Sequence, residues 1–85
     1  MPELKVRKKD GRIEPFDRGK MAGGIQKSGA SPEEVEKIAS EVEIWAQSAA
    51  VDGVIGSAEL KTKLLELLRA TNPTAATSFE EFRKS

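Results

Sequence analysis

The spacing of apolar residues changes along the chain and divides it into short segments. In residues 31–50 and 58–71, apolar residues recur every three or four positions, which places them on one face of an α-helix. The same spacing continues after residue 73. Before residue 17 the chain instead holds two short, partly alternating and partly β-branched runs around an Asp-Gly pair, which is typical of a β-hairpin. This pattern predicts an α+β fold in which a β-hairpin precedes four short helices.

The hairpin is predicted to have strands over residues 5–9 and 12–16, joined by a two-residue turn at Asp10-Gly11. Such a turn would pair Arg7 with Glu14. Because strand side chains alternate, Val6, Lys8, Ile13 and Pro15 would lie on one face, and Arg7, Lys9, Arg12 and Glu14 on the other. Neither face is cleanly apolar, and a two-stranded ribbon is not stable alone, so it should lie on the rest of the protein.

The first helix is predicted over residues 18–28, with Asp17 as its N-cap and Gly29 as its C-cap. Glycines at positions 19, 23 and 24 weaken it, since each interior glycine costs about 1 kcal/mol relative to alanine. We therefore expect it to be the least stable helix.

The second helix has clearer start signals. Ser31 is the predicted N-cap, Pro32 occupies the first helical position, and Glu34 completes a capping box. Residues 51–56 interrupt the helical pattern, and Val54-Ile55 within them is consistent with either a short strand or an extended loop.

The last two helices follow this interruption. Ser57 is predicted to cap a helix over residues 58–71, and Asn72-Pro73 to end it and start the next. In a chain of this length nearly all large apolar residues are needed inside, so we assign the apolar stripes to the core rather than to a partner groove. These predicted core residues include Trp45, Leu60, Leu64, Leu67, Leu68, Ala75 or Ala76, Phe79 and Phe82.

Composition limits the chemistry open to this protein. The 85 residues suit one domain, predicted over residues 3–85, and they include no cysteine and no histidine. Disulfides, thiolate metal sites and the usual general base are therefore excluded, and we predict no catalytic residue and no metal ligand. Neither a signal peptide nor an apolar run of the roughly 20 residues that span a bilayer is present, so we expect a cytoplasmic protein.

Charge is unevenly distributed although its formal total is zero. Residues 1–28 carry eight Lys or Arg against four Asp or Glu, whereas residues 29–85 carry six against ten. In one interpretation the lysines of the hairpin lie on an edge strand and have no role beyond preventing sheet aggregation. Alternatively, Lys8, Lys9 and Lys20 converge on a polyphosphate, since Lys20 would lie near a helix N-terminus, which favours anions. Arg18 is expected to point to solvent.

A known family matches this stretch. VRKKDGRIEPFDRGKM, residues 6–21, resembles the opening of the ATP-cone domain, typically V-x-K-R-D-G-x-x-x-x-F-D-x-x-K-I. This module occurs at the amino end of many ribonucleotide reductase large subunits, in the repressor of reductase genes, and on some other enzymes. Further similarity lies in SPEEVEKIASEVE, IGSAEL and NPTAATSF, so that the resemblance covers residues 4–83. Lys9 departs from the pattern, because arginine is usual there.

The resemblance implies a four-helix bundle capped by the β-hairpin or by a small three-stranded sheet. ATP or dATP, with Mg²⁺ accompanying it, would bind between cap and bundle. Val6 would border the base, and the lysines would reach the phosphates. Glu14 and Asp17 would contact the base and neighbouring groups, while residues at the start of the third helix would close the other side. The implied ligand-binding residues are Val6, Lys8, Lys9, Glu14, Asp17, Lys20, Ser57 and Lys61.

By this resemblance the protein is a non-catalytic regulatory domain that signals nucleotide status to a catalytic domain or subunit, or through self-association. Two alternatives stay open. A small nucleic-acid-binding domain could use the basic amino-terminal region, although the sequence has no interleaved aromatic platform. A degenerate cone could keep the fold and act only as a protein-interaction module.

Overall fold

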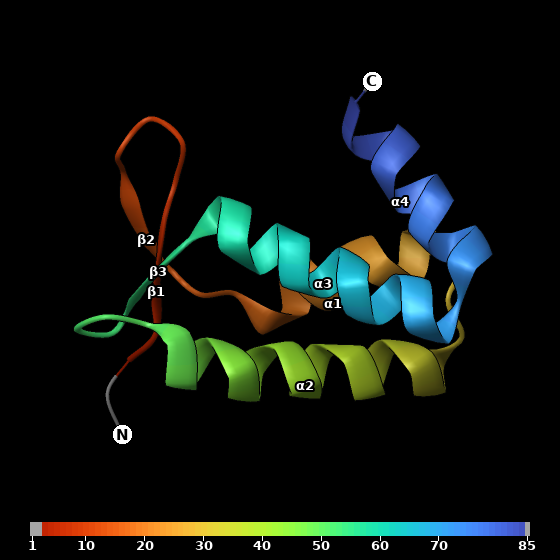
Figure 1. The fold of residues 1–85 in the computed structure, drawn as a ribbon, viewed down its shortest axis with the longest axis horizontal. Coiled ribbons are helices and arrows are strands. Elements are labelled where there is room, and N and C mark those ends of the chain that lie inside the picture. The colour runs from red at the N-terminus through yellow and green to blue at the C-terminus, as the bar shows by residue number, and fades with distance from the viewer. Residues whose placement is uncertain (1–2, 85) are drawn as a thin grey trace.

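A computed structural model describes the backbone of residues 3–84 and the side chains of residues 3–81. Within these residues three strands and four helices follow one another (Figure 1): β1 (Lys5–Arg7), β2 (Ile13–Pro15), α1 (Arg18–Lys27), α2 (Pro32–Ala49), β3 (Val54–Gly56), α3 (Ser57–Thr71) and α4 (Pro73–Lys84). The predicted α+β class is confirmed. None of the helices in the described region is long and apolar enough to cross a membrane.

The hairpin register differs by one residue from the prediction. Val6 lies opposite Glu14, and Arg7 lies opposite Ile13 rather than Glu14. The Lys8 N–H donates to the Arg12 carbonyl at 2.7 Å, and the Gly11 N–H donates to the Lys8 carbonyl at 2.9 Å, so the loop has three residues. Gly11 takes a left-handed φ of 91°, which is the conformation that such a loop requires at its last position.

This shift moves side chains to the opposite face of the hairpin. Because strand side chains alternate, a one-residue change of register exchanges the faces of one strand relative to the other. Glu14 therefore joins Val6 and Lys8 on one face, while Ile13 moves to the outer face and is 50% exposed. The predicted grouping of Glu14 with Arg7 and Lys9 is wrong.

The third strand decides between the two readings of Val54-Ile55. β3 pairs in parallel with β1, with Ile55 opposite Val6, and the strand order is β2-β1-β3. Val6 and Ile55 are both buried and pack with Ala46 of α2 in a small apolar cluster. The sheet thus sits at one end of the helices, and the hairpin projects beyond them (Figure 1).

The helix ends agree with most of the predicted caps. Asp17 caps α1 and the capping box of Ser31 and Glu34 begins α2, as predicted. α1 ends one residue early, with Ser28 as its C-cap, and Gly29 follows it. The prediction for Ser57 is wrong: because β3 runs directly into α3, Gly56 is the N-cap, and no side chain caps this helix.

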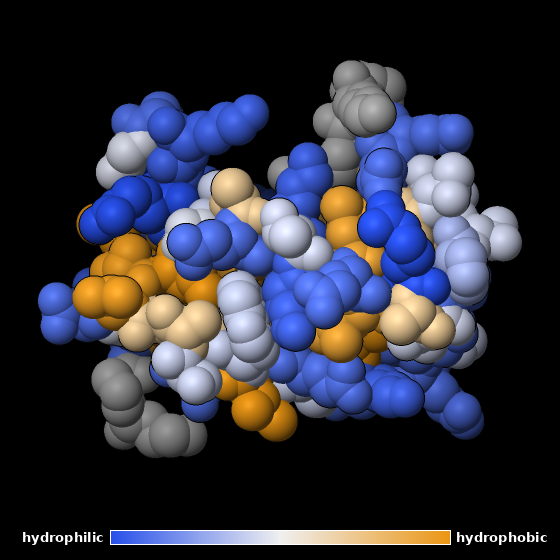
Figure 2. Space-filling view, in the orientation of Figure 1, coloured by the Kyte–Doolittle hydropathy of each residue, from blue (hydrophilic) through white to orange (hydrophobic). Residues whose placement is uncertain are grey.

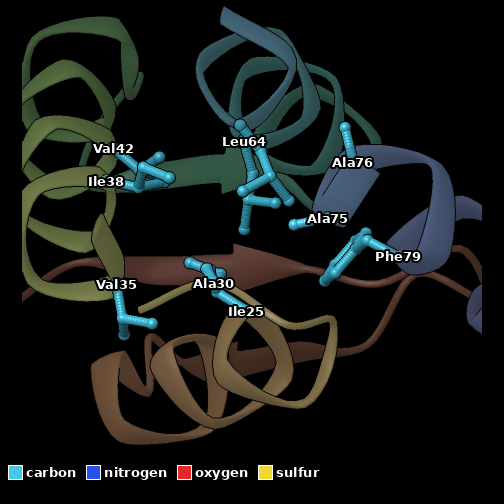
Figure 3. Close-up of a cluster of buried hydrophobic side chains, with 10 residues drawn as sticks. Ile25, Ala30, Val35, Ile38, Val42, Leu64, Ala75, Ala76 and Phe79 are labelled. Atoms are coloured by element: carbon cyan, nitrogen blue, oxygen red, sulfur yellow. The ribbon is translucent and has the colours of Figure 1, made fainter. Parts of the chain in front are cut away.

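A larger apolar cluster fills the space between the helices. Figure 3 shows side chains from all four helices pointing into it, including Ile25 of α1, Ile38 of α2, Leu64 of α3 and Phe79 of α4. The predicted leucine stripe of α3 is confirmed as core, with Leu64 and Leu68 buried and Leu60 and Leu67 packed against the cluster. Trp45 is half-buried against the second cluster, and the Phe82 side chain lies outside the described residues.

The prediction that α1 is the least stable helix can be tested at its glycines. A Cβ built at Gly23 meets no atom within 4 Å. We expect Gly23→Ala to raise the free energy of unfolding by up to about 1 kcal/mol, because alanine is the better helix former and nothing must move to accept its methyl group. Urea unfolding followed by circular dichroism measures this. Equal or lower stability of the variant would contradict an α1 that is helical at this position.

Glu34, in the first turn of α2, forms a hydrogen bond to Asn72, which lies between α3 and α4. Its Oε1 accepts from the Ser31 N–H at 2.9 Å and from the Asn72 side-chain amide at 3.2 Å. Asn72 in turn accepts from the Ala75 N–H at 3.1 Å, where α4 begins. The hydrogen bond from the Ser31 backbone, followed by that from Asn72, lowers the pKa of Glu34 below its ordinary value.

A lowered pKa makes stability depend on pH. The ionised Glu34 stabilises the fold above the ordinary glutamate pKa of about 4.3, and this contribution is lost as the pH falls from there through the lower pKa of the folded protein. We expect Glu34→Gln to be less stable than wild type at pH 7 and the difference to shrink below about pH 4. Glu41→Gln is the control, because Glu41 is exposed on α2 and bonds to no other described side chain. A pH-independent difference for Glu34→Gln would contradict this assignment.

Candidate functional site

A cavity of about 750 Å³ lies between the sheet, α1, α3 and Phe79 of α4. Its volume falls within the roughly 300–1,000 Å³ typical of small-molecule sites. Seven of the eight residues predicted for ligand binding line it: Val6, Lys8, Glu14, Asp17, Lys20, Ser57 and Lys61. Residues far apart in the sequence thus meet around one space.

The hairpin supplies one wall. Val6, Lys8 and Glu14 share the face that the three-residue loop turns toward the helices. Val6 is buried and apolar, whereas Lys8 and Glu14 are half-buried. The Glu14 carboxylate lies 3.7 Å from Nη1 of the exposed Arg12. A ligand here would meet an apolar surface beside one cation and one carboxylate.

Lys9 is not among the residues that line the cavity. It is the first residue of the hairpin loop and is exposed there. Figure 2 shows the hydrophilic residues gathered on this projecting tip. Its role in binding therefore stays a prediction from the resemblance.

The start of α1 forms a second wall. The Asp17 carboxylate accepts from the Lys20 backbone N–H at 3.0 Å, and this bond fixes the first turn. That N–H is consequently satisfied within the protein and is not free for an anion. The exposed ammonium of Lys20, rather than its backbone, is the group that can serve a ligand.

The start of α3 forms the third wall and carries Ser57 and Lys61. No side chain caps α3, but the Glu59 carboxylate lies in its first turn and partly offsets the partial positive charge there. The Ser57 hydroxyl makes no hydrogen bond to another described residue, so it is available to a ligand. The Lys61 ammonium, which lines the cavity, is the group at this end of the helix that favours a negatively charged ligand.

The charges on the cavity wall are unbalanced. Four cations, Lys8, Arg18, Lys20 and Lys61, face two carboxylates, Glu14 and Asp17, although the whole chain is formally neutral. The three lysines form no ion pair with any residue that the structure describes. Their mutual repulsion would be relieved by an anionic ligand between them.

Arg18 differs from these lysines. The prediction that the Arg18 side chain points to solvent is wrong. Its Nη2 donates to Glu36 at 2.8 Å and to Ser40 at 3.0 Å, so the guanidinium lies against α2. The sequence pattern could not reveal this contact, because it joins residues on two different helices.

The apolar floor of the cavity was also missed from the sequence. It includes Phe16, Met21, Leu60, Leu64 and Phe79. Their helical or strand spacing marks them as inward-facing, but spacing does not distinguish a side chain that fills the core from one that borders a cavity. Such a floor suits a flat apolar group such as an aromatic ring.

Acidic residues in the described region do not gather at one place. The structure brings together no group of three or more His, Cys, Asp or Glu residues there that could hold a metal ion. Only the two carboxylates of Glu14 and Asp17 border the cavity.

Comparison with known proteins identifies the family to which the chain belongs. Residues 4–84 match the family model described as ATP cone domain. The chain is 33% identical over 91 residues to the transcriptional repressor NrdR of Symbiobacterium thermophilum, covering 98% of this chain and 60% of that protein. It is 36% identical over 86 residues to NrdR of Syntrophus aciditrophicus, covering 92% of this chain and 54% of that protein. The chain therefore spans little more than half the length of these relatives.

Proposed function

Because the chain belongs to the ATP-cone domain family, whose members are nucleotide-binding regulatory modules, we propose that it is a non-catalytic domain that binds ATP or dATP in the cavity between sheet and helices. The observation that carries this proposal is the set of three unpaired lysines on that cavity wall. A triphosphate supplies the counter-charge that the described residues do not.

The two ends of the nucleotide call for different surroundings. We assign the base to the apolar floor beside Val6, where the Glu14 carboxylate can accept a hydrogen bond from an amino group of adenine. The phosphates are assigned to Lys8, Lys20 and Lys61 and to the uncapped start of α3 with Ser57. Mg²⁺ is expected to arrive with the phosphates, as it usually does. Asp17 acts mainly as the cap that fixes the turn carrying Lys20.

A regulatory domain must change its contact with another domain or protein when the nucleotide binds. We propose that the domain signals nucleotide status to a catalytic domain or subunit, or to another copy of itself, in the cytoplasm. Residues 3–85 would fold as one domain. Nucleotide binding would stabilise the packing of the hairpin and α1 against α3 by linkage, because the ligand would contact all three of these cavity walls.

An amide chemical-shift titration with ATP, dATP and GTP tests the proposal. ATP or dATP should move resonances of Lys8, Lys20, Ser57 and Lys61 and leave the far end of α2 unchanged. A single-stranded oligonucleotide, titrated at two salt concentrations, is the comparison. Steeply salt-dependent oligonucleotide binding without mononucleotide binding would favour the nucleic-acid alternative. A folded protein that binds neither ligand at millimolar concentration would support a degenerate cone.

A further inference from the structure

In the first turn of α1, Met21 is the residue that packs against the main apolar cluster. Ile25 is the single fully buried residue of this helix, and it lies near the opposite end. Gly19 and Lys20 are exposed, and Met21 is half-buried. Yet this turn carries Lys20 and is capped by Asp17, both of which line the cavity. An interaction in addition to the packing of Met21 would help to keep this part of the cavity wall in place.

Arg18 provides that interaction. Its Nη2 lies 2.8 Å from Glu36 Oε1 and 3.0 Å from Ser40 Oγ, and its Nε lies 3.9 Å from Glu43 Oε1. The three partners are spaced four and three residues apart on α2, so they form one row on the face of that helix. In the described part of the chain, these are the ion pairs that join α1 to α2.

Two functions are open to an arginine at this position. It lines the cavity and could donate to the ligand itself. Its Nη2 and Nε, however, already face two carboxylates and a hydroxyl on α2, whereas Nη1 has no partner among the described residues. A direct contact with an anionic ligand through Nη1 would leave the contacts with α2 in place. Because every contact of the guanidinium among the described residues is with α2, the geometry favours an anchoring function.

We propose that Arg18 is a positioning residue: through Glu36, Ser40 and Glu43 it holds the first turn of α1 on α2 and so keeps Lys20 at the cavity. Its effect on nucleotide affinity rests on the proposed function. Its effect on the order of the turn does not, because that effect belongs to the ligand-free protein.

Two variants remove the contact from opposite sides. Arg18→Ala removes the guanidinium, and the double variant Glu36→Gln with Glu43→Gln removes the carboxylates, neither of which lines the cavity. Arg69→Ala is the matched control, since Arg69 pairs with Glu80 across α3 and α4, away from the cavity. Exposed ion pairs contribute little to overall stability, so all three variants should fold.

The first readout is amide hydrogen exchange in the ligand-free protein. The Lys20 N–H bonds to the Asp17 side chain and the Met21 N–H to the Asp17 carbonyl, so both report on the first turn. We expect them to exchange about three- to tenfold faster in Arg18→Ala and in the double carboxylate variant, and at the wild-type rate in Arg69→Ala. Unchanged exchange in both test variants would overturn the proposal.

The second readout is ATP affinity, measured by the chemical-shift titration. Arg18→Ala and the double carboxylate variant should each bind about three- to tenfold more weakly, and combining them should add little because both act through the same pairs. Tighter binding by the double carboxylate variant would overturn the proposal, since Arg18 would then be a ligand-binding residue restrained by α2. If wild type binds no ATP, the proposed function fails, and hydrogen exchange alone decides the anchoring function.

Discussion

Lys20→Ala is expected to abolish most of the increase in melting temperature that millimolar ATP gives the wild-type protein. Lys20 lines the cavity and pairs with no carboxylate among the described residues. A hydrogen bond to a charged group contributes about 1.5–3 kcal/mol, which corresponds to roughly a 10- to 100-fold loss of affinity. Because ligand stabilisation depends on the ratio of ligand concentration to Kd, most of the shift should disappear at a fixed ATP concentration.

Differential scanning fluorimetry with and without ATP measures this effect. Without ATP the variant should melt close to wild type, since Lys20 is exposed and its backbone cap to Asp17 remains. Lys37→Ala is the matched control, because it removes the same charge from an exposed position on α2 outside the cavity. A full ATP shift in Lys20→Ala would show that the triphosphate lies elsewhere.

Ile25→Ala should have the largest effect on stability. Ile25 is fully buried between the helices and is the main apolar anchor of α1. Replacing a buried isoleucine by alanine costs about 2–5 kcal/mol. A domain of this size has a total stability of roughly 4–13 kcal/mol, and each kcal/mol shifts Tm by about 4–8 °C. We therefore expect a fall in Tm of more than about 10 °C.

Two further variants separate the loss of packing from a general effect of substitution. Ile25→Val should cost only about 0.5–1.5 kcal/mol, because most of the buried volume is kept. Ile44→Ala changes an isoleucine of α2 that is 69% exposed and should alter stability by less than about 0.5 kcal/mol. Similar losses for Ile25→Ala and Ile44→Ala would contradict the assignment of Ile25 to the core.

The hairpin illustrates how far a local signal extends. The Asp10-Gly11 pair predicted a hairpin, and its position is confirmed. Asp-Gly suits both a two-residue turn and a three-residue loop with glycine in the left-handed conformation. Hydrogen bonds between Lys8, Gly11 and Arg12 select the second, and only this choice brings Glu14 to the cavity face.

The same limit applies to the start of α3. Serine before an apolar helical pattern predicts an N-cap, but Ser57 is instead the first helical residue. Strand β3 extends to Gly56 because it pairs with β1, a segment about 50 residues earlier in the sequence. This pairing leaves Ser57 free of a capping bond and directs it to the cavity, which no signal within the local sequence could indicate.

The α+β class, the order of the helices, the N-caps of α1 and α2, and the basic character of the amino-terminal stretch could all be predicted from the sequence. These features depend on spacing and on hydrogen bonds between residues a few positions apart. Three features became clear only from the packed fold: β3 joins the sheet, the Arg18 side chain of α1 lies against α2, and lysines from the hairpin, α1 and α3 line one cavity. Those contacts join segments that are distant along the chain, so their geometry is set by how the helices and the sheet pack rather than by any local pattern.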